Sequence, residues 1–213
     1  MKPIINIHAH QPAPDAILSL EPAQFNPSPG QNYSVAIHPW NTGNVTQADI
    51  DLLRQAAQHP QVVAIGETGL DRLRGVDITT QRHILQTHIQ LAEQLRKPLI
   101  IHLVRATSEF LAQLRLTTIT TPVVIHGFRG KPAVANQLIK AGCHLSFGER
   151  FNPESPAIAF PEHFLLETDT STLTISQVAQ RVAQTLQLSP DTVLRAAADN
   201  ATRVLSYGGF CTG

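Results

Sequence analysis

The sequence predicts an α/β fold, a (β/α)8 TIM-type barrel in a compact form. Short, continuously apolar segments alternate with stretches of helical spacing, which is typical of a parallel sheet covered by helices. Eight apolar segments lie near residues 4, 17, 35, 64, 100, 124, 145 and 166, and this barrel needs eight strands. A chain of 213 residues is long enough for one large domain or two small ones. Because the eight segments complete one barrel, we expect residues 1–213 to form a single domain.

Helix signals separate most of these strands. Thr46 is a candidate N-cap, Pro132 suits a first helical turn, and Gly142 suits a helix end. Thr174 and Gln177 have the spacing of a capping box. The expected helices cover residues 46–58, 79–95, 107–115 and 132–142 and most of the C-terminal third.

The chain is short for this fold, which usually takes about 250 residues. We expect the helix after the first strand to be missing and most of the helix after the seventh strand to be lost, because prolines interrupt 149–162. An open doubly wound sheet is the alternative fold. It is disfavoured because no Gly-rich phosphate loop follows the first strand.

Composition restricts the setting and the partners. Sixteen basic and sixteen acidic residues give a formal net charge of zero, which argues against extended, non-specific binding of duplex nucleic acid. A pocket for one phosphate or a strand end stays possible. We find no apolar run near the ~20 residues that span a membrane and no export signal. The two cysteines are too few for a disulfide framework. We therefore expect a cytoplasmic protein that binds no membrane and has no obligate protein partner.

The ends of the apolar segments carry metal-ligand side chains. His8 and His10 follow the first segment two residues apart, so in a strand both imidazoles would point to one face. Carboxyl ends of barrel strands converge at one mouth, where such enzymes carry their chemistry. Histidines and carboxylates gathered there need partners, and a metal supplies them. The candidate ligands are His8, His10, Glu67, His102, His126 and Asp169.

The number of candidate ligands favours two divalent metal ions. One zinc-like catalytic ion needs about three protein ligands. Six candidates are enough for two ions about 3.5–4 Å apart that share a carboxylate, lower the pKa of a water and polarise the scissile group.

Taken in order, the motifs resemble the TatD family of metal-dependent hydrolases in the amidohydrolase superfamily, and the resemblance covers nearly the whole chain. The motifs are Ile7-His8-Ala9-His10, Ala36-Ile37-His38-Pro39, Ala64-Ile65-Gly66-Glu67-Thr68-Gly69-Leu70-Asp71, Ile101-His102, His126-Gly127-Phe128, Leu145-Ser146-Phe147-Gly148, Leu166-Glu167-Thr168-Asp169 and Asn200-Ala201-Thr202-Arg203.

The resemblance implies a phosphoesterase or deoxyribonuclease that uses a metal-activated water and two ions of Zn, Mg or Mn. It also implies how the ligands divide. His8, His10, Glu67 and Asp169 would hold one ion, and Glu67, His102 and His126 the other. Asp169 would orient the attacking water or take its proton, so Asp169 and the shared Glu67 are the candidate catalytic residues.

Three positions depart from the family pattern without removing a ligand. Asn6 replaces an aspartate, Gly127-Phe128-Arg129 replaces Cys-Phe-Ser, and Arg105 follows its histidine by three residues instead of two. Because these changes fall in loops that would face the substrate, the substrate stays open. Hydrolysis of an amide, a lactone or another ester is the alternative activity, and metal binding without turnover is a further one.

Substrate contacts are expected at His38, Arg105 and Arg129. Guanidinium groups match phosphate oxygens in bidentate geometry, and basic residues after strands four to seven would rim the mouth, unless they form loop salt bridges. Asp71 could pair with an arginine or contact the substrate. The basic residues are Arg72, Arg74, Arg105, Arg129, Lys131 and Arg150.

Overall fold

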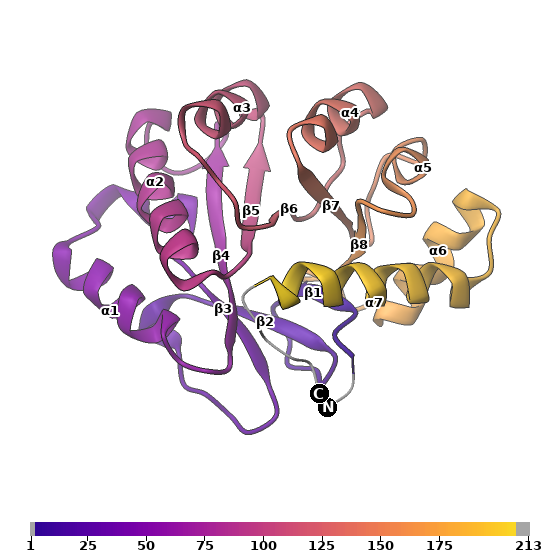
Figure 1. Ribbon diagram of the computed structural model, residues 1–213, viewed down its shortest axis with the longest axis horizontal. Helices are drawn as coiled ribbons and strands as arrows, with labels where there is room; N and C mark the ends of the chain where they lie inside the picture. The colour runs from indigo at the N-terminus through magenta and orange to yellow at the C-terminus, as the bar shows by residue number, and fades with distance from the viewer. Residues whose placement is uncertain (1–2, 208–213) are drawn as a thin grey trace.

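The computed structural model, which describes residues 3–207, is a closed barrel in which each strand pairs in parallel with its neighbours in chain order. The predicted fold and all eight strand positions are confirmed. Helices lie on the outside of the strands (Figure 1). The strands are β1 (Asn6–Ala9), β2 (Ala16–Leu20), β3 (Asn32–Val35), β4 (Val62–Asp71), β5 (Leu99–Val104), β6 (Val123–Ile125), β7 (Cys143–Phe147) and β8 (Phe164–Leu166).

The helices also follow the predicted spacing. Thr46 and Thr174 each form a complete capping box, and Asp77 caps the longest helix by accepting from the backbone N–H groups of Thr79 and Thr80. None of the helices within residues 3–207 is long and apolar enough to cross a membrane. The α-helices are α1 (Gln47–Ala57), α2 (Ile78–Leu95), α3 (Thr107–Leu116), α4 (Pro132–Lys140), α5 (Pro156–Ala159), α6 (Ile175–Leu186) and α7 (Pro190–Ser206).

The compact form arises from reduced connections. No helix joins β1 to β2, and only the 3-10 turn η1 (Pro22–Gln24) lies between β2 and β3. The connection from β7 to β8 keeps four helical residues, in α5. The missing helix after the first strand and the reduced helix after the seventh are thus both confirmed. A second 3-10 helix, η2 (Pro39–Asn44), follows β3 and lies beside the mouth.

Strand β4 runs further than the sequence predicts, because it continues through Glu67 as far as Asp71. Its last four residues pair with β5 in the register Thr68 to Ile101 through Asp71 to Val104. Gly69 has φ 148°, and a Cβ there would lie 2.0 Å from the carbonyl oxygen of His102. Only glycine allows this approach, which brings the ends of β4 and β5 together at the mouth.

Two apolar clusters hold the barrel together. The larger one lies between the strands and the surrounding helices. The smaller one joins Ile7, Ile100 and Leu165, from strands around the barrel, to Val204 and Leu205 of α7. Side chains from strands around a closed barrel meet only in its interior. This cluster therefore fills the barrel, and α7, in yellow beside β8, covers the end opposite the mouth (Figure 1).

The first and last strands close the barrel through Asn6. Its side-chain amide donates to Oγ1 of Thr168 at 2.8 Å, and its carbonyl oxygen accepts from the backbone N–H of Thr168 at 3.0 Å. Both groups of the amide are therefore used. This pair joins residues 162 positions apart in the sequence.

Candidate metal centre

A cleft of about 1130 Å³ opens at the carboxyl ends of the strands. Its polar floor includes His10, Glu67, His126 and Asp169. The apolar part of its wall includes Leu103, Phe128 and Val134. The site therefore offers a charged floor beside an apolar wall, which suits a ligand with both an ionic and a non-polar part.

The six predicted ligands come together around Glu67. We call His8, His10, Glu67, His102, His126 and Asp169 the histidine–carboxylate cluster. Oε1 of Glu67 lies 2.7 Å from Nδ1 of His102 and 2.7 Å from Nε2 of His126. Its other oxygen, Oε2, lies 3.3 Å from Nε2 of His8 and 3.6 Å from Nε2 of His10. The two oxygens of one buried carboxylate thus face two different pairs of histidines.

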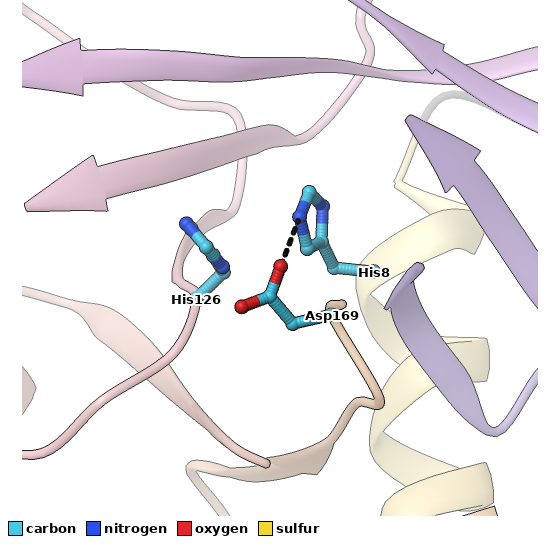
Figure 2. Close-up of side chains that lie close together, drawn as sticks. All are labelled: His8, His126 and Asp169. Atoms are coloured by element: carbon cyan, nitrogen blue, oxygen red, sulfur yellow. Dashed lines mark ion pairs between the residues drawn. The ribbon is translucent and has the colours of Figure 1, made fainter. Parts of the chain in front are cut away.

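Asp169 lies on the same side of Glu67 as His8 and His10. Its Oδ1 is 3.8 Å from Nε2 of His8 and 3.6 Å from Nε2 of His10. Figure 2 shows Asp169 pointing between His8, at the end of β1, and His126, which follows β6. The backbone fixes this arrangement, because Asp169 N–H donates to His8 O and His10 N–H donates to Asp169 O, both at 3.1 Å.

The cluster fits a metal ion. Three sets of ligand atoms each lie within 4.8 Å of one another. His8 is fully buried, and among residues 3–207 neither of its ring nitrogens finds a hydrogen-bond partner, although Nε2 lies near Glu67. A buried imidazole without a partner is costly, and a cation among these donors would supply one. The sets are His8, His126 and Asp169; His8, His10 and Glu67; and His38, Glu67 and His102.

The electrostatics of the cluster favour positive charge. Burial opposes ionisation of Glu67, but the charges of His126 and His8 hold the pKa of Glu67 well below its usual value. Burial likewise disfavours charge on His126, but the carboxylates of Glu67 and Glu167 raise the pKa of His126 well above the ordinary histidine value. The cluster therefore stabilises a cation beside Glu67, as a metal site requires.

His38 contacts the cluster directly. Its Nε2 is 3.2 Å from Oε1 of Glu67, so it belongs to a candidate ligand set as well as to the cleft wall. Its Nδ1 accepts from the backbone N–H of Trp40, and its own backbone N–H donates to Glu21. The η2 turn thus holds this imidazole at the mouth.

Two further residues shape the site. Asp71 pairs with no arginine side chain within residues 3–207; its side-chain partners are the indole N–H of Trp40 at 2.7 Å and Nε2 of His102 at 3.1 Å. Sequence reasoning did not identify Trp40. The available signal was its place two residues after His38, at a strand end. Glu167 accepts from Gly127 N–H and lies 3.3 Å from Nδ1 of His126, so it supports that histidine.

The basic residues divide into two groups. Arg74, Arg105, Arg129 and Lys131 line the cleft. Arg105 and Arg129 are exposed and make no salt bridge with any residue in 3–207. The expectation that the whole basic set rims the mouth is wrong for Arg72, which pairs with Glu109 on α3, and for Arg150, which is not part of the cleft lining.

Comparison with known proteins agrees with this geometry. The profile of TatD related DNase matches residues 26–206. A Mycobacterium tuberculosis protein described as an uncharacterized metal-dependent hydrolase, TatD, is 30% identical over 201 residues, which cover 82% of this chain and 76% of that protein. The 3'-5' ssDNA/RNA exonuclease TatD of Musicola paradisiaca is 32% identical over 153 residues, which cover 67% of this chain and 58% of that protein.

Solved structures show the same barrel. The crystal structure of YJJV, a TatD homolog from Escherichia coli K12, superposes with a TM-score of 0.78 at 19% identity and covers 91% of this chain and 88% of that chain. A hydrolase of the TatD family from Entamoeba histolytica superposes with a TM-score of 0.69, also at 19% identity, over 83% of this chain and 75% of that chain.

Proposed function

Because this chain belongs to the TatD related DNase family and is a metal-dependent hydrolase, we propose that it cleaves phosphodiester bonds at DNA ends or in short single strands. One observation carries the proposal: Arg105 and Arg129, which form no salt bridge within residues 3–207, line the same cleft as the histidine–carboxylate cluster. A cation site next to guanidinium groups suits a phosphate anion. A relative named as a single-strand exonuclease supports the same substrate class.

The two oxygens of Glu67 support binding of two divalent ions. Oε2, with His8, His10 and Asp169, would hold one ion, and Oε1, with His102 and His126, the other. When bound, such ions polarise the phosphoryl group and make a water more acidic. The many imidazole nitrogens favour a zinc-like ion over magnesium.

Asp169 is the proposed base. Its carboxylate is one-quarter exposed and lies at the cleft, whereas Glu67 is almost completely buried. A water in the cleft can therefore reach Asp169 and transfer a proton to its carboxylate as the oxygen attacks phosphorus. The leaving oxygen departs from the opposite side and takes a proton from solvent. Glu67 orients the histidines around it and takes no proton in this scheme.

Arg105 and Arg129 are proposed to hold a substrate phosphate, with His38 contacting its oxygens. Both arginines follow neighbouring strands, β5 and β6, and both line the cleft. The apolar wall formed by Leu103, Phe128 and Val134 would take a nucleobase or sugar. A neutral chain with cations gathered at one cleft suits a strand end better than a long duplex.

The proposal is tested with purified protein, metal analysis and a substrate panel. The panel contains an end-labelled single-stranded oligonucleotide, a small phosphodiester, an amide and a lactone. We expect phosphodiester cleavage that a chelator abolishes and added Zn²⁺ or Mn²⁺ restores. Glu67→Gln should remove both bound metal and activity, whereas the exposed control Glu162→Gln should change neither.

Two other results would replace the proposal. Hydrolysis of the amide or lactone without phosphodiester cleavage would assign the alternative activity of the amidohydrolase superfamily. Bound metal without turnover on any substrate would assign a metal-binding protein.

For domain organisation we propose one barrel over residues 1–213, because β1 and β8 pair with each other and neither half closes the barrel alone.

A further inference from the structure

The two ring nitrogens of His102 have different neighbours. Nδ1 lies 2.7 Å from Oε1 of Glu67 and 3.3 Å from Nε2 of His126, so it faces the histidine–carboxylate cluster. Nε2 faces the opposite way and lies 3.1 Å from Oδ2 of Asp71. A neutral imidazole carries one N–H and one lone pair, and therefore only one of these nitrogens is free to bind a metal.

Asp71 is an ionised acceptor behind His102, because donors surround its carboxylate. Oδ2 accepts from Nε1–H of Trp40 at 2.7 Å, while Oδ1 accepts from the backbone N–H groups of Leu73 at 2.8 Å and Arg74 at 3.2 Å. A carboxylate only accepts hydrogen bonds. Both ring nitrogens of His102 therefore face a carboxylate, Nδ1 that of Glu67 and Nε2 that of Asp71. With a cation bound beside Glu67, the lone pair of Nδ1 would point at the cation, and the proton would lie on Nε2, where it donates to Asp71.

The backbone of Asp71 is held as firmly as its side chain. Its N–H donates to Oε1 of Gln81 at 2.7 Å, and its carbonyl accepts from Nε2 of the same glutamine at 2.9 Å. Gln81 is fully buried in the first turns of α2. A rigid path thus runs from α2 through Asp71 to His102.

His126 faces Glu67 with Nε2, whereas His102 faces it with Nδ1. The Nε2 of His126 faces Oε1 of Glu67 at 2.7 Å, and its Nδ1 faces Glu167 at 3.3 Å. Each of the two histidines on this side of Glu67 therefore has its own acidic partner behind it. The two rings differ only in which nitrogen points inward.

We propose that Asp71 is a positioning residue for the metal centre: it fixes the Nε2–H tautomer of His102 and thereby presents Nδ1 as a metal ligand, with Trp40 holding Asp71 in place. This inference rests on the proposed metal site and not on the substrate. Carboxylates behind ligating histidines fix the tautomer and ring orientation, and their loss typically weakens metal binding about 10- to 100-fold.

The test has two measurements, a spectrum of the metal-loaded protein and a metal titration. In the Zn²⁺-loaded protein, two-bond ¹H–¹⁵N correlation spectra report which ring nitrogen of His102 carries the proton, and the His102→Gln variant assigns the signal. We expect the Nε2–H form in the wild type. A predominant Nδ1–H form would overturn the proposal, whatever the protein hydrolyses.

The second measurement is calorimetric titration of Zn²⁺ or Mn²⁺ into the variants. Asp71→Asn keeps the shape of the side chain but replaces one acceptor oxygen by an N–H donor. We therefore expect the affinity for the second metal ion to fall about 10- to 100-fold. Trp40→Phe removes one donor to Asp71 and should weaken the same event less. Asp77→Asn, the matched control at the N-cap of α2, should leave binding unchanged. Wild-type affinity in Asp71→Asn would overturn the proposal, and if that variant fails to fold, the wild-type tautomer and Trp40→Phe still decide it.

Discussion

His10 and Asp169 are joined twice, once through the backbone and once through their side chains. The backbone N–H of His10 donates to the carbonyl of Asp169 at 3.1 Å, and Nε2 of His10 lies 3.6 Å from Oδ1 of Asp169. The backbone bond holds the two residues in place independently of the charge on the aspartate. The side chain of Asp169 can therefore be changed without moving the strands that carry it.

Replacing Asp169 by asparagine should abolish hydrolysis while the fold persists. The amide keeps the shape of the side chain but has neither the charge nor the basicity of the carboxylate. We expect turnover to fall by about 10²- to 10⁴-fold if Asp169 takes the proton of the attacking water, and further if an ion is also lost. Single-turnover kinetics and metal analysis measure the two effects separately. Near-normal turnover would assign Asp169 another role.

Replacing Arg105 or Arg129 by alanine should weaken substrate binding and leave the metal content unchanged. Both side chains are exposed at the cleft and form no salt bridge within the described chain. We expect KM for a phosphodiester to rise about threefold to tenfold, and less at high salt, because exposed charges are screened. Arg115→Ala, an exposed arginine outside the cleft lining, serves as the control. Unchanged KM in both variants would remove the local argument for a phosphate substrate.

Buried His88 should cause the free energy of unfolding to fall in mild acid. This residue of α2 is fully buried; Nδ1–H donates to Ile84 O at 2.8 Å, and Nε2 accepts from Ile37 N–H at 2.9 Å. Burial lowers the pKa of His88 to about 4. In the unfolded chain its pKa returns to about 6.5, so the stabilising contribution is present above pH 6.5 and is lost as the pH falls toward 4.

The expected loss is about 3 kcal/mol between those two pH values, since one pKa unit corresponds to about 1.36 kcal/mol. Urea unfolding at pH 7 and pH 4.5 measures it. His88→Leu should be less stable at pH 7, because Ile37 N–H loses its acceptor, but it should show a smaller decrease on acidification. His144, whose pKa burial also lowers to about 4, should keep part of the decrease in both proteins. An equal decrease in wild type and variant would refute the assignment to His88.

The fold was predictable because its signals are local. Apolar runs, cap residues and prolines mark most of the strands and helices, and even the lost helices follow from interruptions such as Pro12 and Pro153. The extension of β4 to Asp71 was not predictable, since Gly66 and Gly69 usually end a strand. It depends on the close approach of β5 at His102, which is a contact between distant segments.

The sequence predicted that the six candidate ligands lie together, because the carboxyl ends of all strands in a parallel barrel meet at one mouth. Side-chain pairings could not be inferred in the same way. Arg72 pairs with Glu109, and Asp71 pairs with Trp40 and His102, because of directions that loops take after their strands. Only the structure therefore distinguishes the basic residues that line the cleft from those that do not.

The closure of the barrel by β1 and β8 also sets an order in time. During synthesis His8 and His10 leave the ribosome well before β8 and Asp169, which follows β8. A nascent chain that stops before β8 has no closed mouth and no complete set of ligands. A complete metal centre can therefore form only after β8 and Asp169 have left the ribosome, and products truncated before them should lack hydrolase activity.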